Sequence, residues 1–364
     1  METGEQSSYA PRPPTPRTAK SVRGGDIETA RELVEKARLA EQHDQSAKAL
    51  GLYDDALARL GADSVDPFLP DVLRWKGTLL RERGETEAAY RCYALSLEKA
   101  TLGGWKGSQA HALNCLGTIA QRRGDQKETE RLYANASKLA EEAGDARLLG
   151  MIEQNRGVLA NTRGDFASAA TFYSRSLGAF EMAADSEPIS WVLNNLGILH
   201  TKIRNFAEAR VHLERGLAIA INRNDVVVQN VITLNLAEVW VGLGRLDVAD
   251  EFCVQALEQA QRRVDHLTAA GALKVRAAIE RQRGALDKSI ATLRIAIYEA
   301  EGAEDRLLHA ELLRELGEIS RAVGNPGAAR SALREAADAF AVVGASHELA
   351  EVQAELKALP ERQR

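Results

Sequence analysis

Cysteine is scarce in this sequence, and its three cysteines stand far apart at Cys92, Cys115 and Cys253. An odd number of cysteines without CxxC spacing argues against a disulfide framework and against a zinc site. The seven histidines form no HExxH pattern, and no nucleophile elbow, P-loop or dinucleotide fingerprint is present. We therefore expect no metal, no cofactor and no catalytic residue. A protein that is not an enzyme is the favoured interpretation, and an enzyme or enzyme subunit is the least favoured one.

The sequence also lacks an excess of positive charge and any long apolar run. Its 47 basic residues are outnumbered by 52 acidic ones, which gives a formal net charge of −5 and a pI near 5.9. Such a balance disfavours nucleic acid and anionic membranes as partners. No apolar run approaches the roughly 18 residues that a membrane span needs, and no apolar segment opens the chain. These absences predict a cytoplasmic protein, and the preference for arginine over lysine suggests a bacterial one.

Proline is rare as well, and four of the nine prolines fall within residues 11–16. The surrounding Ser, Gly and Arg residues show no apolar period, so residues 1–25 are predicted to be a disordered tail. A second, short tail is predicted at residues 360–364.

A 40-residue repeat fills the rest of the chain. The stretch LNNLGILH at residues 193–200 has counterparts in EQNRGVLA (153–160), LNCLGTIA (113–120) and TLNLAEVW (233–240). A small residue marks the same place in eight repeats, at Ala37, Gly77, Gly117, Gly157, Gly197, Ala237, Ala277 and Gly317. Because internal repeats decide the fold, residues 26–345 are predicted to form one repeat array.

Glycine and aspartate recur at fixed positions in most repeats. A second glycine follows seven residues after the small residue in six repeats, and Asp44 and Arg204 replace it in the other two. Since the intervening pattern is helical, this glycine is expected to end a helix in the left-handed conformation. An aspartate recurs near the repeat boundary as a candidate helix N-cap, at Asp145, Asp185, Asp225, Asp265 and Asp305. Each repeat is therefore predicted to contain two helices of roughly 16 residues.

Small residues also predict how the two helices pack. A second small residue follows twelve positions after the first, and Tyr or Leu usually follows four positions later, as in Ala209 and Leu213. Such spacing lets the two helices approach closely, with the large side chain filling the adjacent space. One helix pair cannot cover its own apolar faces, so the copies must stack. Residues 346–359 place Leu349, Val352 and Leu356 on one face and are expected to form a terminal capping helix.

At these positions the sequence resembles the tetratricopeptide repeat family. The family pattern is present as Leu193, Leu196, Gly197, Ala209 and Leu213, and again as Leu113, Leu116, Gly117, Gly124, Tyr133 and Ala136. The resemblance covers about residues 27–345, and its 40-residue period is similar to kinesin light chains and Rap-type bacterial regulators. It implies an all-α, right-handed superhelical α-solenoid of about eight helix-turn-helix repeats. Lys76, Glu153, Arg156 and Arg276 depart from the family pattern, so the packing there is expected to be less standard.

The asparagines of the repeat lie on one face of each first helix. With the small residue numbered 8, positions 2, 5, 6, 9, 12 and 13 share a face, which we call the first-helix face. The resemblance implies that this face lines the concave wall of the array. Amides there can bind the backbone of an extended peptide, because each carries a donor and an acceptor. The alternative is that they bond the neighbouring repeat and hold the stack in register. The candidate amides are Asn114, Gln154, Asn155, Asn161, Asn194, Asn195 and Asn235.

Basic residues accompany these amides. Arg74, Arg81, Arg122 and Lys202 lie on the first-helix face and would select acidic side chains or a terminal carboxylate. Solvated charges with local salt bridges are the alternative, and Lys274, Arg281 and Arg314 further along are interrupted by Glu238, Glu311 and Glu318. Trp191 at position 2 is a candidate anchor for a partner.

A protein-interaction scaffold or adaptor is therefore the favoured function. It would hold a peptide segment of a partner, possibly an acidic one, in the concave groove. A peptide-responsive regulatory sensor of a partner protein is the alternative.

Overall fold

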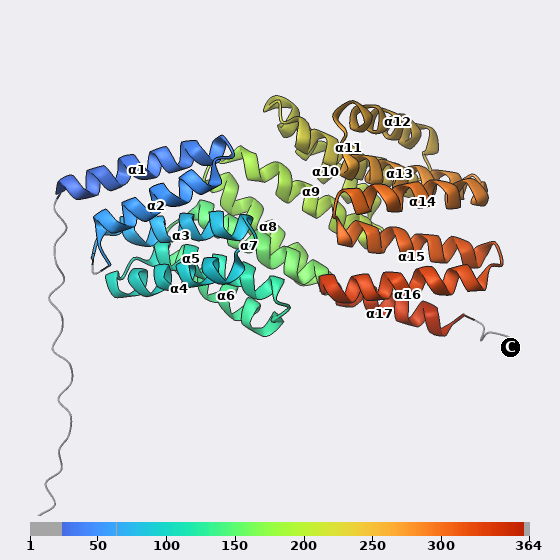
Figure 1. Ribbon diagram of the computed structural model, residues 1–364. Helices are drawn as coiled ribbons and strands as arrows, with labels where there is room; N and C mark the ends of the chain where they lie inside the picture. Colours follow the sequence, from blue (N-terminus) through green and yellow to red (C-terminus); the bar gives the residue numbers. More distant parts are fainter. Residues whose placement is uncertain (1–23, 63, 360–364) are drawn as a thin grey trace, which may run out of the picture. The chain divides into compact units, whose positions relative to one another are not determined.

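The computed structural model of the protein describes residues 24–62 and 64–359, and within these ranges its regular elements are all α-helices (Figure 1). The predicted all-α repeat fold is confirmed. The predicted tail falls mostly outside the described residues, as do residues 360–364, whereas Gly24 and Gly25 begin the first helix. No described helix is both long and apolar enough to cross a membrane.

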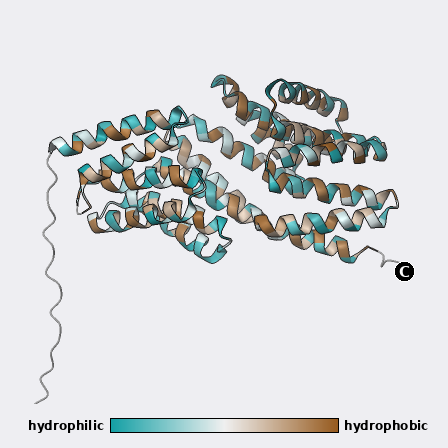
Figure 2. Ribbon diagram, viewed as in Figure 1, coloured by the Kyte–Doolittle hydropathy of each residue, from teal (hydrophilic) through white to brown (hydrophobic). Residues whose placement is uncertain are grey.

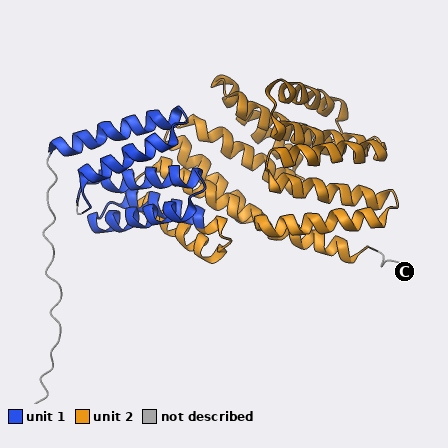
Figure 3. Cartoon of the chain, viewed as in Figure 1, with its two compact units in different colours: residues 1–119 blue, residues 120–364 orange. Residues whose placement is uncertain are grey.

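The chain divides into two compact units, residues 1–119 and 120–364 (Figure 3). The boundary falls inside helix α5 (Lys106–Arg122). In unit 1, each helix from α1 to α4 contacts the next one along the chain. These four helices are α1 (Gly24–Gln42), α2 (Ser46–Leu60), α3 (Phe68–Glu82) and α4 (Thr86–Gly103).

Unit 2 contains five complete helix pairs, from α7–α8 to α15–α16, together with α6 and α17, and every helix from α6 onward contacts the next one. The first helices of neighbouring repeats also touch, because α7 contacts α9, α9 contacts α11, α11 contacts α13 and α13 contacts α15. The helices are α6 (Gln126–Ala143), α7 (Ala146–Thr162), α8 (Phe166–Met182), α9 (Ser186–Lys202), α10 (Phe206–Asn222), α11 (Val226–Gly242), α12 (Leu246–Arg263), α13 (His266–Gln282), α14 (Leu286–Gly302), α15 (Arg306–Ala322), α16 (Pro326–Val343) and α17 (Ser346–Lys357).

Hydrophobic and hydrophilic residues follow one another in short stretches along the helices (Figure 2). Within a repeat, the small residue of the first helix meets the large residue of the second. An ideal Cβ on Gly157 would lie 2.5 Å from Cδ1 of Tyr173, and Tyr173 is 1% exposed. Leu333 contacts Gly317 in the same way. The predicted close approach of the two helices is confirmed, because the tyrosine or leucine fills the space that the glycine leaves.

Left-handed residues mark the first turn of every repeat and the second turn of every repeat after the first. The first series comprises Asp44, Gly84, Gly124, Gly164, Arg204, Gly244, Gly284 and Gly324, all with positive φ. It confirms the predicted C-caps and includes the two positions without glycine. A second series, not predicted from the sequence, comprises Gly104, Gly144, Ala184, Asn224, Val264, Glu304 and Gly344. Only three of its seven members are glycine, so no repeated residue type marks this turn. Val264 is the most strained member, because β-branched side chains strongly disfavour positive φ.

Aspartate caps most first helices of unit 2, as predicted. The Asp145, Asp225, Asp265 and Asp305 carboxylates each accept a hydrogen bond from a backbone N–H in the first turn of the helix that follows. Asp185 is the exception, since its side chain makes no cap hydrogen bond. Its Oδ2 instead accepts from Arg147 Nε at 2.5 Å, which links the starts of two successive first helices.

The packing of glycine against tyrosine yields a prediction with an internal control. Gly157→Ala is expected to lower the free energy of unfolding by about 1–3 kcal/mol, because the added methyl overlaps the buried Tyr173 ring. Gly178→Ala in α8, where no atom lies near the added methyl, is expected to raise it by about 0.4–1 kcal/mol. Urea unfolding followed by circular dichroism measures both. Equal effects of the two substitutions would contradict the packing described here.

Candidate functional site

The twelve residues predicted to bind a peptide fall in both units. Arg74, Arg81 and Asn114 belong to unit 1, and the other nine belong to unit 2.

In unit 1, the two arginines are largely covered by their own surroundings. The Arg74 side chain is 16% exposed and pairs with Asp71 at 3.3 Å, and its guanidinium lies 5.3 Å from the ring centre of Trp75. Arg81 is 25% exposed and lies 3.5 Å from Glu82. Asn114 is buried, with 7% exposure, and its contact with a peptide stays a prediction.

In unit 2, one pair of asparagines joins neighbouring repeats. Asn235 Nδ2 on α11 donates to Asn194 Oδ1 on α9 at 2.7 Å, and Asn194 is 3% exposed. Burial of this amide is offset by the hydrogen bond, which holds the two first helices in register. This bond is the stacking contact that the alternative interpretation predicts for Asn194, and a direct contact of Asn194 with a peptide stays a prediction.

Other predicted residues of unit 2 stay partly accessible. Gln154 and Asn155 on α7, and Asn195 on α9, are half-buried, and Arg122 at the end of α5 is exposed. Asn155 and Asn195 occupy position 6 of successive first helices, and these helices are in contact. Asn161 is half-buried near the end of α7, and its Oδ1 atom is buried without a recorded hydrogen bond. Trp191 is half-buried and packs against the cluster of Ala209, Leu213 and Val228.

Lys202 has a partner from the C-terminal end of the chain. Its Nζ lies 2.6 Å from Glu348 Oε1 in the first turn of α17, across 146 residues of sequence. Glu348 is 7% exposed, so its charge needs a partner. Sequence reasoning missed this pair, because no local spacing connects two residues so distant in the chain.

A second contact accompanies the Lys202–Glu348 pair. The His347 ring lies edge-on to Phe166 at 5.3 Å between ring centres, beside the turn at Gly164. The start of α17 thus touches the α7–α8 turn and the end of α9 within unit 2. We call these two side-chain contacts the α17 contact.

The basic residues of the last repeats are also paired within the chain. Lys274 Nζ lies 2.7 Å from Glu311 and 3.9 Å from Glu238. Arg281 lies 3.2 Å from Glu318, and Arg314 binds Glu351 and Glu355 of α17 at 2.6 and 2.5 Å. Most of these bonds join residues 37 positions apart, so they connect successive first helices. The predicted alternative of local salt bridges describes this end of the face.

Burial and crowding shift the pKa values of this charged group. Burial raises the pKa of Glu315 to about 7, with repulsion from Glu238 and Glu311 opposing the attraction of Lys274. Burial lowers the pKa of Lys274, but the surrounding carboxylates outweigh it and hold that pKa well above its usual range. Lys274 and Lys202 together lower the pKa of Glu311 against the effect of burial. Glu315 is the member that changes protonation near neutral pH.

Glu153 departs from the repeat pattern, and its hydrogen bonds to Ser137 and Arg156 explain how a carboxylate can be buried there. It is fully buried, and its Oε1 accepts from Ser137 Oγ at 2.5 Å and from Arg156 Nη1 at 2.8 Å. Glu153 and Arg156 are three residues apart on α7, so two departures from the repeat pattern compensate each other. The three-residue spacing of Glu153 and Arg156 is a signal in the sequence from which this pair could have been predicted.

The three cysteine thiols lie in surroundings that disfavour the thiolate form. Burial raises the pKa of the Cys253 thiol to about 11, and burial raises the pKa values of Cys92 and Cys115 as well. Thiols in this state are weak nucleophiles at neutral pH. Across residues 24–62 and 64–359, no group of three or more His, Cys, Asp or Glu side chains could hold a metal ion.

Comparison with known proteins identifies the repeat. Residues 155–222 match the family model described as tetratricopeptide repeat. The comparison with curated proteins gives no match. Solved structures with a similar fold include a tetratricopeptide repeat protein from Parabacteroides merdae, with 18% identity and a TM-score of 0.56, covering 79% of this chain and 97% of that one.

Two further structures share the fold. The apo form of RapI is 13% identical with a TM-score of 0.56, covering 76% of this chain and 98% of that one. NprR in complex with its cognate peptide NprX is 11% identical with a TM-score of 0.58, covering 79% and 85%. At such identities the similarity is one of fold.

The raised pKa of Glu315 predicts a pH dependence. From about pH 4.5 to about pH 7 the unfolded chain loses this proton before the folded chain does, so stability is expected to fall as pH rises. Glu315→Gln should flatten this fall and be the more stable form at pH 8, by on the order of 1–3 kcal/mol. Urea unfolding at several pH values measures it. Glu318→Gln is the control, and an equal flattening there would contradict the assignment.

Proposed function

We propose that this chain, which is built from tetratricopeptide repeats, is a protein-interaction scaffold whose first-helix face binds a peptide segment of a partner protein. Within unit 2, the proposed contacts come from α7, α9 and the end of α5. The observation that carries the proposal is the alignment of half-buried amides on successive first helices, chiefly Asn155 and Asn195. Gln154 and Asn161 extend this row, and Trp191 offers an aromatic surface beside it.

Amide side chains suit an extended peptide because they can donate and accept at once. A peptide backbone presents one donor and one acceptor per residue, so amides aligned on neighbouring helices can bond it without reading its sequence. The hydrogen bond between Asn194 and Asn235 fixes the register of α9 and α11, the helices that carry part of this face. The tetratricopeptide model match at residues 155–222 covers most of these residues.

Acidic groups are the proposed side-chain preference of the site. Arg122 and Lys202 both occupy position 13, at the C-terminal ends of α5 and α9, and both belong to unit 2. Lys202 already binds one carboxylate, that of Glu348, which supports carboxylate binding there. Arg74 and Arg81 are retained as a separate proposed contact of unit 1, where Asp71 and Glu82 partly neutralise them.

The proposed partner is a polypeptide, and the proposed location is the cytoplasm. An overall charge of −5 gives no field for nucleic acid or an anionic membrane. The NprR structure contains a cognate peptide on a similar fold, which makes peptide binding by this fold physically reasonable. No catalytic step is included in the proposal.

A peptide selection tests the proposal. A random peptide library is selected on the purified full chain, and the affinities of the selected peptides are measured by calorimetry. The double variant Asn155→Ala/Asn195→Ala is expected to bind about 10–100-fold more weakly, because two amide contacts of roughly 1 kcal/mol or more each are lost. Gln255→Ala, an exposed amide on α12, is the matched control. Selected peptides that bind the double variant as tightly as the wild type would refute the site.

The α17 contact favours a second candidate, a peptide-responsive regulator. A carboxylate from a bound peptide could replace Glu348 at Lys202 and so release the start of α17 from α7–α9. The contact consists of few side chains, which makes the exchange energetically accessible. A scaffold and a regulator then differ in whether the ligand changes the conformation of unit 2.

Hydrogen exchange distinguishes these two candidates. Glu348→Gln is expected to speed amide exchange in α17 by roughly tenfold or more, because the Lys202 bond loses its charge. A selected peptide should cause the same change in the wild-type chain if the protein is a regulator, and small-angle scattering should change with it. Lys357→Gln, which removes an exposed charge from the same helix, is the control. If neither amide exchange nor scattering changes when the peptide is added, the regulator is refuted and the scaffold is the remaining candidate.

A further inference from the structure

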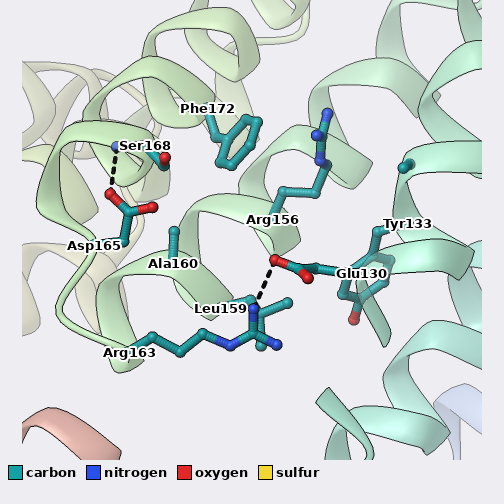
Figure 4. Close-up of a pocket in the computed structure, with 10 residues that line it drawn as sticks. Glu130, Tyr133, Arg156, Leu159, Ala160, Arg163, Asp165, Ser168 and Phe172 are labelled. Carbon is teal, nitrogen blue, oxygen red and sulfur yellow. Dashed lines mark hydrogen bonds and ion pairs between the residues drawn. The ribbon is translucent and has the colours of Figure 1, made fainter. Parts of the chain in front are cut away.

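A cavity of about 260 Å³ lies between α6, α7 and α8 in unit 2 (Figure 4). It is not part of the first-helix face, since its residues on α7 occupy positions 7, 10 and 11 and Arg163, the C-cap of α7, occupies position 14. Leu159, Ala160 and Phe172 form its apolar lining, and Tyr133 and Ala134 of α6 form another wall. An apolar cavity of about 150 Å³ is enough to bind benzene in another protein. This cavity is therefore large enough for an aromatic ring.

Fixed charges surround the apolar lining. Arg163 Nη1 donates to Glu130 Oε1 at 2.7 Å, and Nη2 donates to the Gln126 carbonyl at 3.0 Å. The Arg156 guanidinium lies 4.0 Å from the ring centre of Phe172 and is held there by the buried Glu153. In Figure 4, Ala160 lies between the Asp165–Ser168 pair and the Glu130–Arg163 pair. The arginines are thus held in place beside the cavity.

The same place two repeats later is filled by a tryptophan. Ala160, Glu130 and Phe172 correspond at a distance of 80 residues to Trp240, Arg210 and Phe252. The Arg210 guanidinium lies 5.5 Å from the ring centre of Trp240, and Trp240 and Phe252 pack against the same hydrophobic cluster. The indole of Trp240 therefore occupies the space that Ala160 leaves open.

We infer that the cavity at Ala160 is a docking site for a tryptophan side chain of a polypeptide partner. The partner's indole would lie where the chain's own indole lies in the repeat of Trp240, against Leu159 and Phe172. Arg156, and Arg163 at the rim, would face the electron-rich ring. Trp is also one of the residue types enriched among the side chains that contribute most to binding at protein interfaces.

The inference rests on the proposed function only in taking the partner to be a polypeptide. The cavity and the first-helix face share no residue among those proposed to bind the peptide backbone. Failure of one site therefore leaves the other testable.

Ligand binding to the full chain tests the cavity directly. The probes are a fluoroindole, observed by fluorine NMR, and N-acetyltryptophanamide, which carries the indole as a side chain. The wild-type chain is expected to bind the fluoroindole at one site, and N-acetyltryptophanamide should displace it. Displacement by indole but not by N-acetyltryptophanamide would show a site closed to side chains and would overturn the docking role.

Two variants locate the binding. Ala160→Trp should fill the cavity from within, raise Tm by about 2–4 °C and weaken fluoroindole binding roughly tenfold or more. Ala160→Leu, a smaller filling residue, should also weaken binding if the larger variant does not fold. Trp240→Ala should open the equivalent space and add a second fluoroindole site. Wild-type binding that is absent, or that persists unchanged in both Ala160 variants, would refute the inference.

The double variant Asn155→Ala/Asn195→Ala separates this site from the first-helix face. It is expected to bind fluoroindole as the wild type does, even though its affinity for selected peptide backbones falls. Equal loss of both kinds of binding would show that the two sites are not independent, which contradicts the inference as stated.

Discussion

The structure depends on the close approach of two helices at one small residue in every repeat. Gly157 leaves no room for a methyl group beside the buried Tyr173 ring, and other repeats pair glycine with leucine in the same way. Such an approach lets each helix pair bury a continuous apolar strip against its neighbours. The left-handed residues in both turns then return the chain at a constant length of 40 residues. Because the spacing is constant, equivalent residues of successive repeats lie at equivalent places on their helices.

Polar residues on the first-helix face serve two purposes that sequence periodicity alone does not separate. Asn194 is buried and bonds Asn235, so it helps to hold α9 against α11. Asn155 and Asn195 occupy position 6 of their helices, next to position 5 where Asn194 lies, and their side chains are more accessible. The same division applies to charge, because Lys274 is surrounded by carboxylates of its own chain. A peptide partner would therefore meet a face whose ionic groups are already largely paired, and would be bound mainly through amides and a few cations.

Departures from the repeat pattern coincide with the features of greatest functional interest. Glu153 and Arg156 break the pattern together and hold a guanidinium beside Phe172. Ala160, where Trp240 stands two repeats later, leaves a cavity in the same region. Lys202 ends a first helix with a charge that reaches Glu348 of α17. A repeat array can change single residues in this way at modest cost, because each repeat contacts only its neighbours.

By itself, the sequence determined the helical repeats, their 40-residue period, the first series of left-handed caps and the aspartate N-caps. These features follow from spacing within a few helical turns, where local geometry decides the contacts. Only the tertiary structure decided which amides are buried, which cations are paired and where the cavity lies. The Lys202–Glu348 contact spans 146 residues, and the pKa of Glu315 depends on charges from three helices. No local pattern encodes such contacts, because they join residues of helices that are far apart in the sequence.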